Sequence, residues 1–271
     1  MSQDQVHIIA HDFGGVEAIR AETRHSFARH SHETFGIGLM YRGAQKSASG
    51  RGMVEAGAGN IITVNPREIH DGHPIGDAPR GWNMLYFDTV LIANAAADIT
   101  DTQSTRYEFD RPVIANDTVA RCFAALFAAV TQGNTKTAGL RRAEMLLLLL
   151  HHAVLAPAAG DGPVAFGHIR HAKSLIDDDP ACDISLADLA KACGLSRFQT
   201  LRHFTRATGL TPHAYVIQRR IDLARSLIRG GAPLADAAIA CGFADQSHMN
   251  RHFVRAFGIT PGRYARARHP G

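Results

Sequence analysis

Three histidines in the N-terminal part of the chain have the type and spacing of a metal-binding group. One residue separates His30 from His32, and His70 follows a stretch that contains Gly59 and Pro66. Alternate residues of a β-strand point to the same side, so a strand here would bring His30 and His32 to one face. Three imidazoles together are a ligand set for Zn²⁺ or a similar divalent ion, and His73 is a fourth candidate. The same histidines could instead line an effector pocket without metal or be structural, and the sequence leaves these alternatives open.

A second informative group of residues lies in the last third of the chain, where one sequence pattern occurs twice. The first copy contains Ala192-Cys193-Gly194, His203-Phe204 and Thr211-Pro212, and the second contains Ala240-Cys241-Gly242, His252-Phe253 and Thr260-Pro261. The offset between the copies is 48 residues up to the glycine and 49 from the His-Phe pair onward. The second copy therefore has one additional residue, which we expect inside its second helix.

Each copy predicts a helix-turn-helix, in which a glycine turn precedes a helix whose outer face is free for the major groove of DNA. Ser196 is the expected N-cap of the first such helix. The residues expected to face the core are Leu195, Thr200 and Phe204 in the first copy and Phe243, Met249 and Phe253 in the second. The residues left for DNA are Arg197, Phe198, Leu201, Arg202 and Thr205 in the first copy and Gln246, Ser247, His248, Asn250 and Arg251 in the second.

These outward side chains have the chemistry that reads base edges. Arginine pairs with guanine through two hydrogen bonds, Asn and Gln pair with adenine, and apolar groups touch the thymine methyl. We therefore assign guanine contacts to Arg202 and Arg251, adenine contacts to Gln246 and Asn250, and thymine contacts to Phe198 and Leu201. Arg206 and Arg255, later in each helix, suit a phosphate or an intramolecular pair. Because the copies offer different groups, each chain is expected to read an asymmetric site.

One long helix must join the two motifs. Thr211 is a predicted N-cap before Pro212 at the first helical position, and Gly230-Gly231 ends the helix after Ile228. At about 1.5 Å per residue this helix would hold the motifs roughly 25 Å apart. Ser185 and Asp188 predict a capping box at the start of the first motif.

On these residues, the segment from about His168 to Arg266 resembles the DNA-binding domain of AraC/XylS-type bacterial transcription regulators. The most specific blocks are Gly242 to His248, Arg251-His252-Phe253, Phe257 to Pro261, and Tyr264. The resemblance implies seven helices, and two recognition helices that enter major-groove segments about 34 Å apart. It also implies double-stranded DNA and a small-molecule effector as partners, a homodimer, and RNA polymerase as a further partner.

The N-terminal part reads as a small β-barrel or sandwich. Strand-like runs broken by Gly, Pro and Asn occupy residues 6–88, among them Phe35–Tyr41, Ile61–Val64 and Met84–Phe87. Two apolar helices are expected within residues 117–155, with Phe123, Leu126, Phe127 and Val130 on one stripe of the first. The second, apolar around Leu146–Leu150, packs against the barrel alone or also against a second subunit.

The histidine pattern is similar to the two motifs of cupin barrels, which use three imidazoles to hold a metal. Gly36 and Ile37 stand where cupins usually carry a Glu after the His-x-His pair. In AraC-type regulators a cupin-like barrel usually binds a small effector. Trp82, Tyr41 and Tyr86 are candidate walls of such an effector site, or core residues.

Composition supports two domains with different charge. The Pro/Gly-rich stretch 157–163 predicts a linker between domains 1–156 and 164–271. Residues 164–271 carry 15 Lys/Arg and 8 Asp/Glu, against 14 and 17 in the rest, so the basic surplus lies with the repeats. The sequence shows no export signal and no apolar stretch near the ~20 residues of a membrane span. We therefore expect a cytoplasmic protein with reduced cysteines, in which Cys193 and Cys241 are small buried residues.

The sequence thus predicts an α+β protein of two domains. A cupin-like β-barrel with following helices would precede an all-α domain with two helix-turn-helix motifs. The predicted function is a ligand-responsive bacterial transcription regulator, such as an activator, that binds operator DNA and is not an enzyme. One competing hypothesis is a metal-dependent cupin enzyme, or a metal sensor, fused to a DNA-binding domain. Another is a ligand-independent DNA-bending or global-stress factor of the same family.

Overall fold

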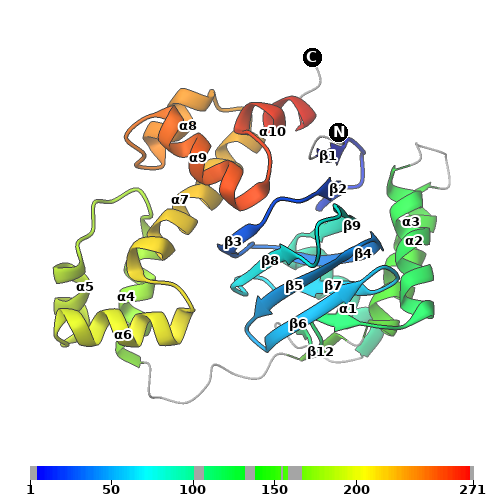
Figure 1. The fold of residues 1–271 in the computed structure, drawn as a ribbon, viewed down its shortest axis with the longest axis horizontal. Helices are drawn as coiled ribbons and strands as arrows, with labels where there is room; N and C mark the ends of the chain where they lie inside the picture. The colour runs from blue at the N-terminus through cyan, green and yellow to red at the C-terminus, as the bar shows by residue number, and fades with distance from the viewer. Residues whose placement is uncertain (1–4, 101–106, 132–137, 154, 158–166, 269–271) are drawn as a thin grey trace. The chain divides into compact units, whose positions relative to one another are not determined.

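The computed structural model of the chain describes residues 5–100, 107–131, 138–153, 155–157 and 167–268 (Figure 1). Contacts divide the chain into a first unit, Met1–Ala159, and a second unit, Gly160–Gly271. The division falls within the predicted linker, residues 157–163. Pro157 itself pairs with Tyr107 in a short strand, and the rest of that stretch lies outside the described residues. Among the described residues, no helix is long and apolar enough to cross a membrane.

The first unit is built on two antiparallel sheets. The six-stranded sheet has the order β1-β2-β9-β4-β7-β11, and the four-stranded sheet has the order β3-β8-β5-β6. The strands of the larger sheet are β1 (Gln5–Ile9), β2 (Val16–Thr23), β4 (Phe35–Arg42), β7 (Ile61–Val64), β9 (Arg80–Phe87) and β11 (Val113–Ile114). Those of the smaller are β3 (Phe27–His30), β5 (Ala44–Ser49), β6 (Gly52–Gly57) and β8 (His70–Pro74). The barrel-like fold expected from the sequence is confirmed, and β7 has the predicted bounds.

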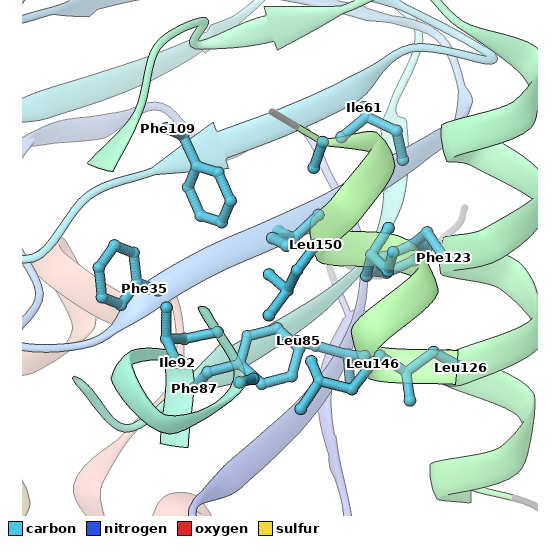
Figure 2. Close-up of a cluster of buried hydrophobic side chains, with 14 of the residues drawn as sticks. Phe35, Ile61, Leu85, Phe87, Ile92, Phe109, Phe123, Leu126, Leu146 and Leu150 are labelled. Atoms are coloured by element: carbon cyan, nitrogen blue, oxygen red, sulfur yellow. The ribbon is translucent and has the colours of Figure 1, made fainter. Parts of the chain in front are cut away.

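Helices α1 (Thr89–Thr100), α2 (Asp117–Thr131) and α3 (Ala138–His152) cover one face of the six-stranded sheet. Figure 2 shows Leu85 and Phe87 of β9 in one cluster with Phe123 of α2 and Leu146 of α3. The stripe predicted for α2 is buried, as expected. The opposite face of the sheet carries a smaller apolar cluster of Met40, Ala56, Ile62, Val64 and Met84. We call this second face the inner face, because the four-stranded sheet lies on that side.

Two elements of the first unit were not predicted. Helix α1 follows β9 directly, and strand β10 (Tyr107–Phe109) pairs with β12 (Leu155–Pro157). Leu155 therefore belongs to a strand, and the helix predicted to reach it ends at His152. Partners that lie about 50 residues apart leave no local pattern in the sequence from which such a pair could be read.

The second unit contains seven helices among its described residues, as the family resemblance implied. They are α4 (Gly167–Asp178), α5 (Leu186–Cys193), α6 (Arg197–Thr208), α7 (Pro212–Arg229), α8 (Leu234–Ala240), α9 (Gln246–Phe257) and α10 (Pro261–Arg268). The predicted caps are present, with a Ser185–Asp188 capping box on α5 and Thr211 capping α7. Figure 1 shows α7 running between α4–α6 and α8–α10.

Helix α7 is fixed to both groups by aromatic contacts. Near its start the ring of Tyr215 lies 5.4 Å from that of Phe204 on α6. Near its end the guanidinium of Arg225 lies 5.0 Å from the ring of Phe257 on α9. One rigid helix therefore connects the two recognition helices, α6 and α9.

Candidate functional site

The two motifs have recognition helices of equal length and differ in the turn that precedes them. Both turns begin alike, because the amide of Leu195 donates to Ala190 O and that of Phe243 donates to Ala238 O, each at 3.0 Å. After this point Ser196 caps α6, whereas Ala244 intervenes before Asp245 caps α9. Helices α6 and α9 each have 12 residues. The expectation that the additional residue lies within the second recognition helix is wrong, since it lengthens the turn.

Helix α6 presents a mixed apolar and basic face. Thr200 and Phe204 are buried, as predicted, and the Thr200 hydroxyl donates to Ser196 O at 2.9 Å. Arg197, Phe198 and Arg202 are exposed, and Phe198 is 72% exposed. Leu201 and Thr205 are half-buried, so they lie at the margin of this face. The phenyl ring of Phe198 is thus accessible on this face, as predicted for a residue on the outer side of the helix.

Helix α9 presents a more polar face. Phe243, Met249 and Phe253 are buried beneath it, as predicted. Gln246, Ser247 and Arg251 are exposed. Arg251 occupies the same helical position as Arg202, six residues after the N-cap in each helix. The two helices thus offer a guanidinium at equivalent places.

Two residues assigned to DNA on α9 are less available than the sequence suggested. Asn250 is half-buried, and its side-chain oxygen is buried with no hydrogen-bond partner among the described residues. A bidentate contact with adenine needs both the oxygen and the amide nitrogen, so Asn250 must change rotamer to make one. His248 is also half-buried, and its ring lies 5.4 Å from that of Phe243.

His248 forms a pair with His252 that the sequence analysis did not identify. Their Nε2 atoms are 3.2 Å apart, so one ring donates a hydrogen bond and the other accepts it. The pKa of His252 is lowered, first by burial and then by the nearby charge of His248. The spacing of four residues on one helix could have indicated this pair.

Arg220 of α7 also escaped the sequence analysis, although it connects the two motifs. Its guanidinium donates to Pro180 O at 2.8 Å and to Cys182 O at 3.1 Å, both before α5. It also donates to Gly242 O at 2.5 Å, in the turn of the second motif. Four backbone acceptors in all converge on this side chain, including Ala181 O. No sequence pattern marks an arginine whose partners are backbone carbonyls.

The cysteines before the turn glycines are structural, as expected. Cys193 and Cys241 are buried. Burial raises the pKa of Cys193 and raises that of Cys241 to about 11. Thiols with such pKa values are protonated near neutral pH and react slowly.

The three histidines of the N-terminal motif come together in the first unit. His30 ends β3, His70 begins β8, and the two are directly paired across the strands. The ring centroids of His30, His32 and His70 lie 4.4–5.1 Å from one another. One nitrogen from each ring lies within 4.8 Å of the others. His32 reaches this cluster although it lies just beyond the end of β3, where strand alternation was expected to continue.

Hydrogen bonds orient two of these rings. His30 Nδ1 lies 2.7 Å from Ala28 O, and His70 Nδ1 lies 3.0 Å from Glu68 O. The pKa of His70 is lowered by burial, which favours its neutral form. His73 is half exposed and points to Asp71, with its Nε2 3.8 Å from Oδ2, so it does not join the cluster.

The three aromatic residues proposed for an effector site do not share a face. The Tyr86 ring lies 4.9 Å from that of His32, and the Trp82 ring lies 6.0 Å from that of Phe27 on β3, so both face inward. Tyr41 lies at a β-bulge, and its ring covers Gly81 on the opposite face of β9. Its hydroxyl donates to Ala21 O at 3.1 Å. Ile37 and Leu39 of the same strand pack in the cluster beneath the helices, so alternation along β4 places Tyr41 on that side of the sheet, away from the inner face.

Comparison with known proteins follows the same division of the chain. The model of the AraC-like ligand-binding domain matches residues 13–150, and that of a helix-turn-helix domain matches residues 189–267. YbfI of Bacillus subtilis (strain 168), an uncharacterized HTH-type transcriptional regulator, is 25% identical over 248 residues, 90% of this chain and 86% of the relative. An apo variant of ToxT from Vibrio cholerae has a similar fold, with a TM-score of 0.60 and 11% identity over 96% of this chain and 100% of that one. ToxT with bound unsaturated fatty acid gives 0.57 and 12% over 98% of each chain.

Proposed function

Because the chain belongs to the AraC family of transcription regulators, we propose that α6 and α9 read base pairs in two adjacent stretches of double-stranded DNA while the barrel binds a small-molecule effector. The observation that carries this function is the pair of capped recognition helices with free outer faces. Arg202 and Arg251 are exposed at equivalent positions of these helices. Arg197, Phe198, Gln246 and Ser247 are the exposed residues around them.

The charge of the second unit supports this proposal. Residues 164–271 carry 15 Lys/Arg against 8 Asp/Glu. A basic surplus attracts the phosphate backbone whatever the base sequence, and its effect falls steeply with salt. Phosphate contacts then fix the register, and base contacts by the exposed side chains supply the specificity.

The inner face of the first unit has the composition of a small-molecule site. It combines the apolar cluster around Met40 and Met84 with the buried guanidinium of Arg80 and the histidine cluster. Sites for small molecules are mostly apolar and carry a few placed polar groups. The fold shared with ToxT, which was solved with an unsaturated fatty acid bound, supports an effector-binding role. We propose no catalytic role for this unit.

Two expected partners stay predictions. A homodimer through the helices after the barrel was predicted, and α3 leaves Leu148 45% exposed beside its buried neighbours Leu146 and Leu149. Contact with RNA polymerase is implied by the family resemblance, and we assign it to no particular residues.

The proposed recognition of base pairs can be tested by comparing the DNA affinities of variants that each lack one arginine of α6 or α9. DNA sequences bound by the wild-type chain are first selected from a random pool, and binding to a selected and a scrambled duplex is then measured. Arg202→Ala and Arg251→Ala should each cost about 1–3 kcal/mol on the selected duplex, which is roughly 5- to 150-fold in Kd. Binding to the scrambled duplex should change little.

Arg206→Ala is the matched control, because it removes the same charge from an exposed position late in α6. It should weaken binding to both duplexes alike and reduce the salt dependence by about one phosphate contact. If Arg202→Ala and Arg251→Ala kept the wild-type discrimination between the duplexes, the assignment of the reading faces would be wrong. A wild-type chain that selects no sequence would refute the function itself.

A further inference from the structure

We propose that His30, His32 and His70 bind a divalent transition-metal ion inside the first unit. The proposal deepens the effector-binding role proposed above, since the ion would belong to the same inner face. It stands on geometry that does not depend on DNA binding. Among the described residues, these three form the one group of His, Cys, Asp and Glu side chains whose ligand atoms gather this closely.

The distances are those of a site that a small rotation would close. The three ligand nitrogens lie within 4.8 Å of one another. Nitrogens on one tetrahedral ion with Zn–N bonds of about 2.0–2.1 Å lie roughly 3.3 Å apart. Each ring must therefore move by only about 1 Å, which rotations about the side-chain bonds supply.

The protonation of two rings is already set for metal binding. Ala28 O and Glu68 O only accept hydrogen bonds, so the Nδ1 atoms of His30 and His70 that face them must donate. In the neutral form of each ring the lone pair is then on Nε2, the nitrogen that would bind a cation. Backbone carbonyls that hold the second nitrogen of a ligating histidine are a common outer shell of metal sites.

The surroundings define the kind of ion. All three ligands are neutral imidazoles, which suit Zn²⁺, Co²⁺, Ni²⁺ and Fe²⁺ better than Mg²⁺ or Ca²⁺. His30 and His32 are only 6% and 3% exposed, so an ion here is largely shielded from water. Glu17 is buried on the same inner face, directly paired with Tyr86, whose ring lies 4.9 Å from His32.

Three protein ligands leave coordination positions open. Gly36 faces inward beside Tyr86, since an added Cβ would lie 3.1 Å from the Tyr86 ring, and it contributes no ligand. A metal with three imidazoles and an open position binds an oxygen or nitrogen donor from a small molecule. The site would thus give the effector a polar anchor beside the apolar cluster of Met40 and Met84.

The test uses the full chain, stripped of metal with a chelator and titrated with Co²⁺. Wild type should take up one ion per chain, show visible ligand-field absorption, and lose fluorescence of Trp82, the only tryptophan. His70→Ala and the milder His30→Gln should weaken binding by roughly 100-fold or more, since even outer-shell partners change metal affinity by about 10–100-fold. Selective DNA binding by the same metal-free preparation is measured in parallel.

His73→Ala is the matched control, because His73 lies three residues after His70 on the same strand and is half exposed. It should bind Co²⁺ as wild type does. The proposal is overturned if wild type takes up no stoichiometric ion, or if His73→Ala loses as much affinity as His70→Ala. If the chain binds no Co²⁺ but still selects its DNA sequence, only the metal-site proposal is refuted. If it binds Co²⁺ but selects no DNA sequence, the DNA-reading function is refuted and the metal site stands.

Discussion

Alanine at Gly242 should destabilise the second unit far more than alanine at Gly194, although the two glycines occupy the same place in the two motifs. Their φ angles are 75° and 65°, in the left-handed region that costs an L-residue about 1–2 kcal/mol. A Cβ added at Gly194 meets nothing within 4 Å, so the cost of Gly194→Ala ends there. At Gly242 the same Cβ would lie 2.6 Å from Ala181 O and 3.0 Å from Cζ of Arg220. Overpacking against backbone adds about 1–3 kcal/mol, so Gly242→Ala should cost about 2–5 kcal/mol.

The measurement is equilibrium unfolding of the full chain in urea, followed by two probes. Far-ultraviolet circular dichroism is weighted towards the helices of the second unit. Fluorescence of Trp82 reports the first unit and serves as the internal control, because the chain has a single tryptophan. The dichroism midpoint should fall slightly for Gly194→Ala and strongly for Gly242→Ala, while the fluorescence midpoint stays constant in both. Equal losses in the two variants would show that the contact with Ala181 does not limit this position.

Two further outcomes are expected on the recognition helices. Phe198→Ala should change the free energy of unfolding by no more than about 0.5 kcal/mol, since the ring is 72% exposed, yet it should weaken binding to the selected duplex about 5-fold. This loss of affinity should vanish on a duplex with deoxyuridine in place of thymidine. A loss of the same size on both duplexes would exclude a thymine-methyl contact. The lowered pKa of His252 means that the folded chain binds fewer protons than the unfolded chain, so the second unit should lose stability as pH falls through about 6.5. His252→Gln should flatten that pH dependence in urea unfolding between pH values of about 7.5 and 5.5, and an unchanged slope would assign it to other groups.

The repeated features of the second unit were predictable because each depends on neighbours in sequence. Caps such as Ser185 and Thr211 act within one helical turn, and the structure has both. Burial of Phe204 and Phe253 follows from the helical spacing of apolar residues, which occurs in both copies of the motif. The histidine cluster was also indicated, since His30 and His32 are close in sequence, although the strand ends between them.

What the sequence misjudged depends on contacts between distant residues. The change in offset between the repeats shows only that the additional residue lies between Gly242 and His252. The N-cap of α9 at Asp245 is needed to place it in the turn, at Ala244. Asn250 and His248 lie on the predicted face, but packing near Phe243 covers part of both.

The way α7 holds the two motifs bears on how the protein reads DNA. Its Tyr215 hydroxyl donates to Asp177 on α4 at 2.8 Å, which fixes the first motif. Arg220 bonds carbonyls that precede α5 and the Gly242 carbonyl in the second turn, which ties the motifs to each other. Hydrogen bonds to charged groups contribute about 1.5–3 kcal/mol each, so movement of one recognition helix against the other is costly. The spacing of the reading helices is therefore set before DNA binds. Adjustment must then come from the duplex, so the deformability of base pairs between the two contacted stretches contributes to the preferred sequence even where no side chain touches them.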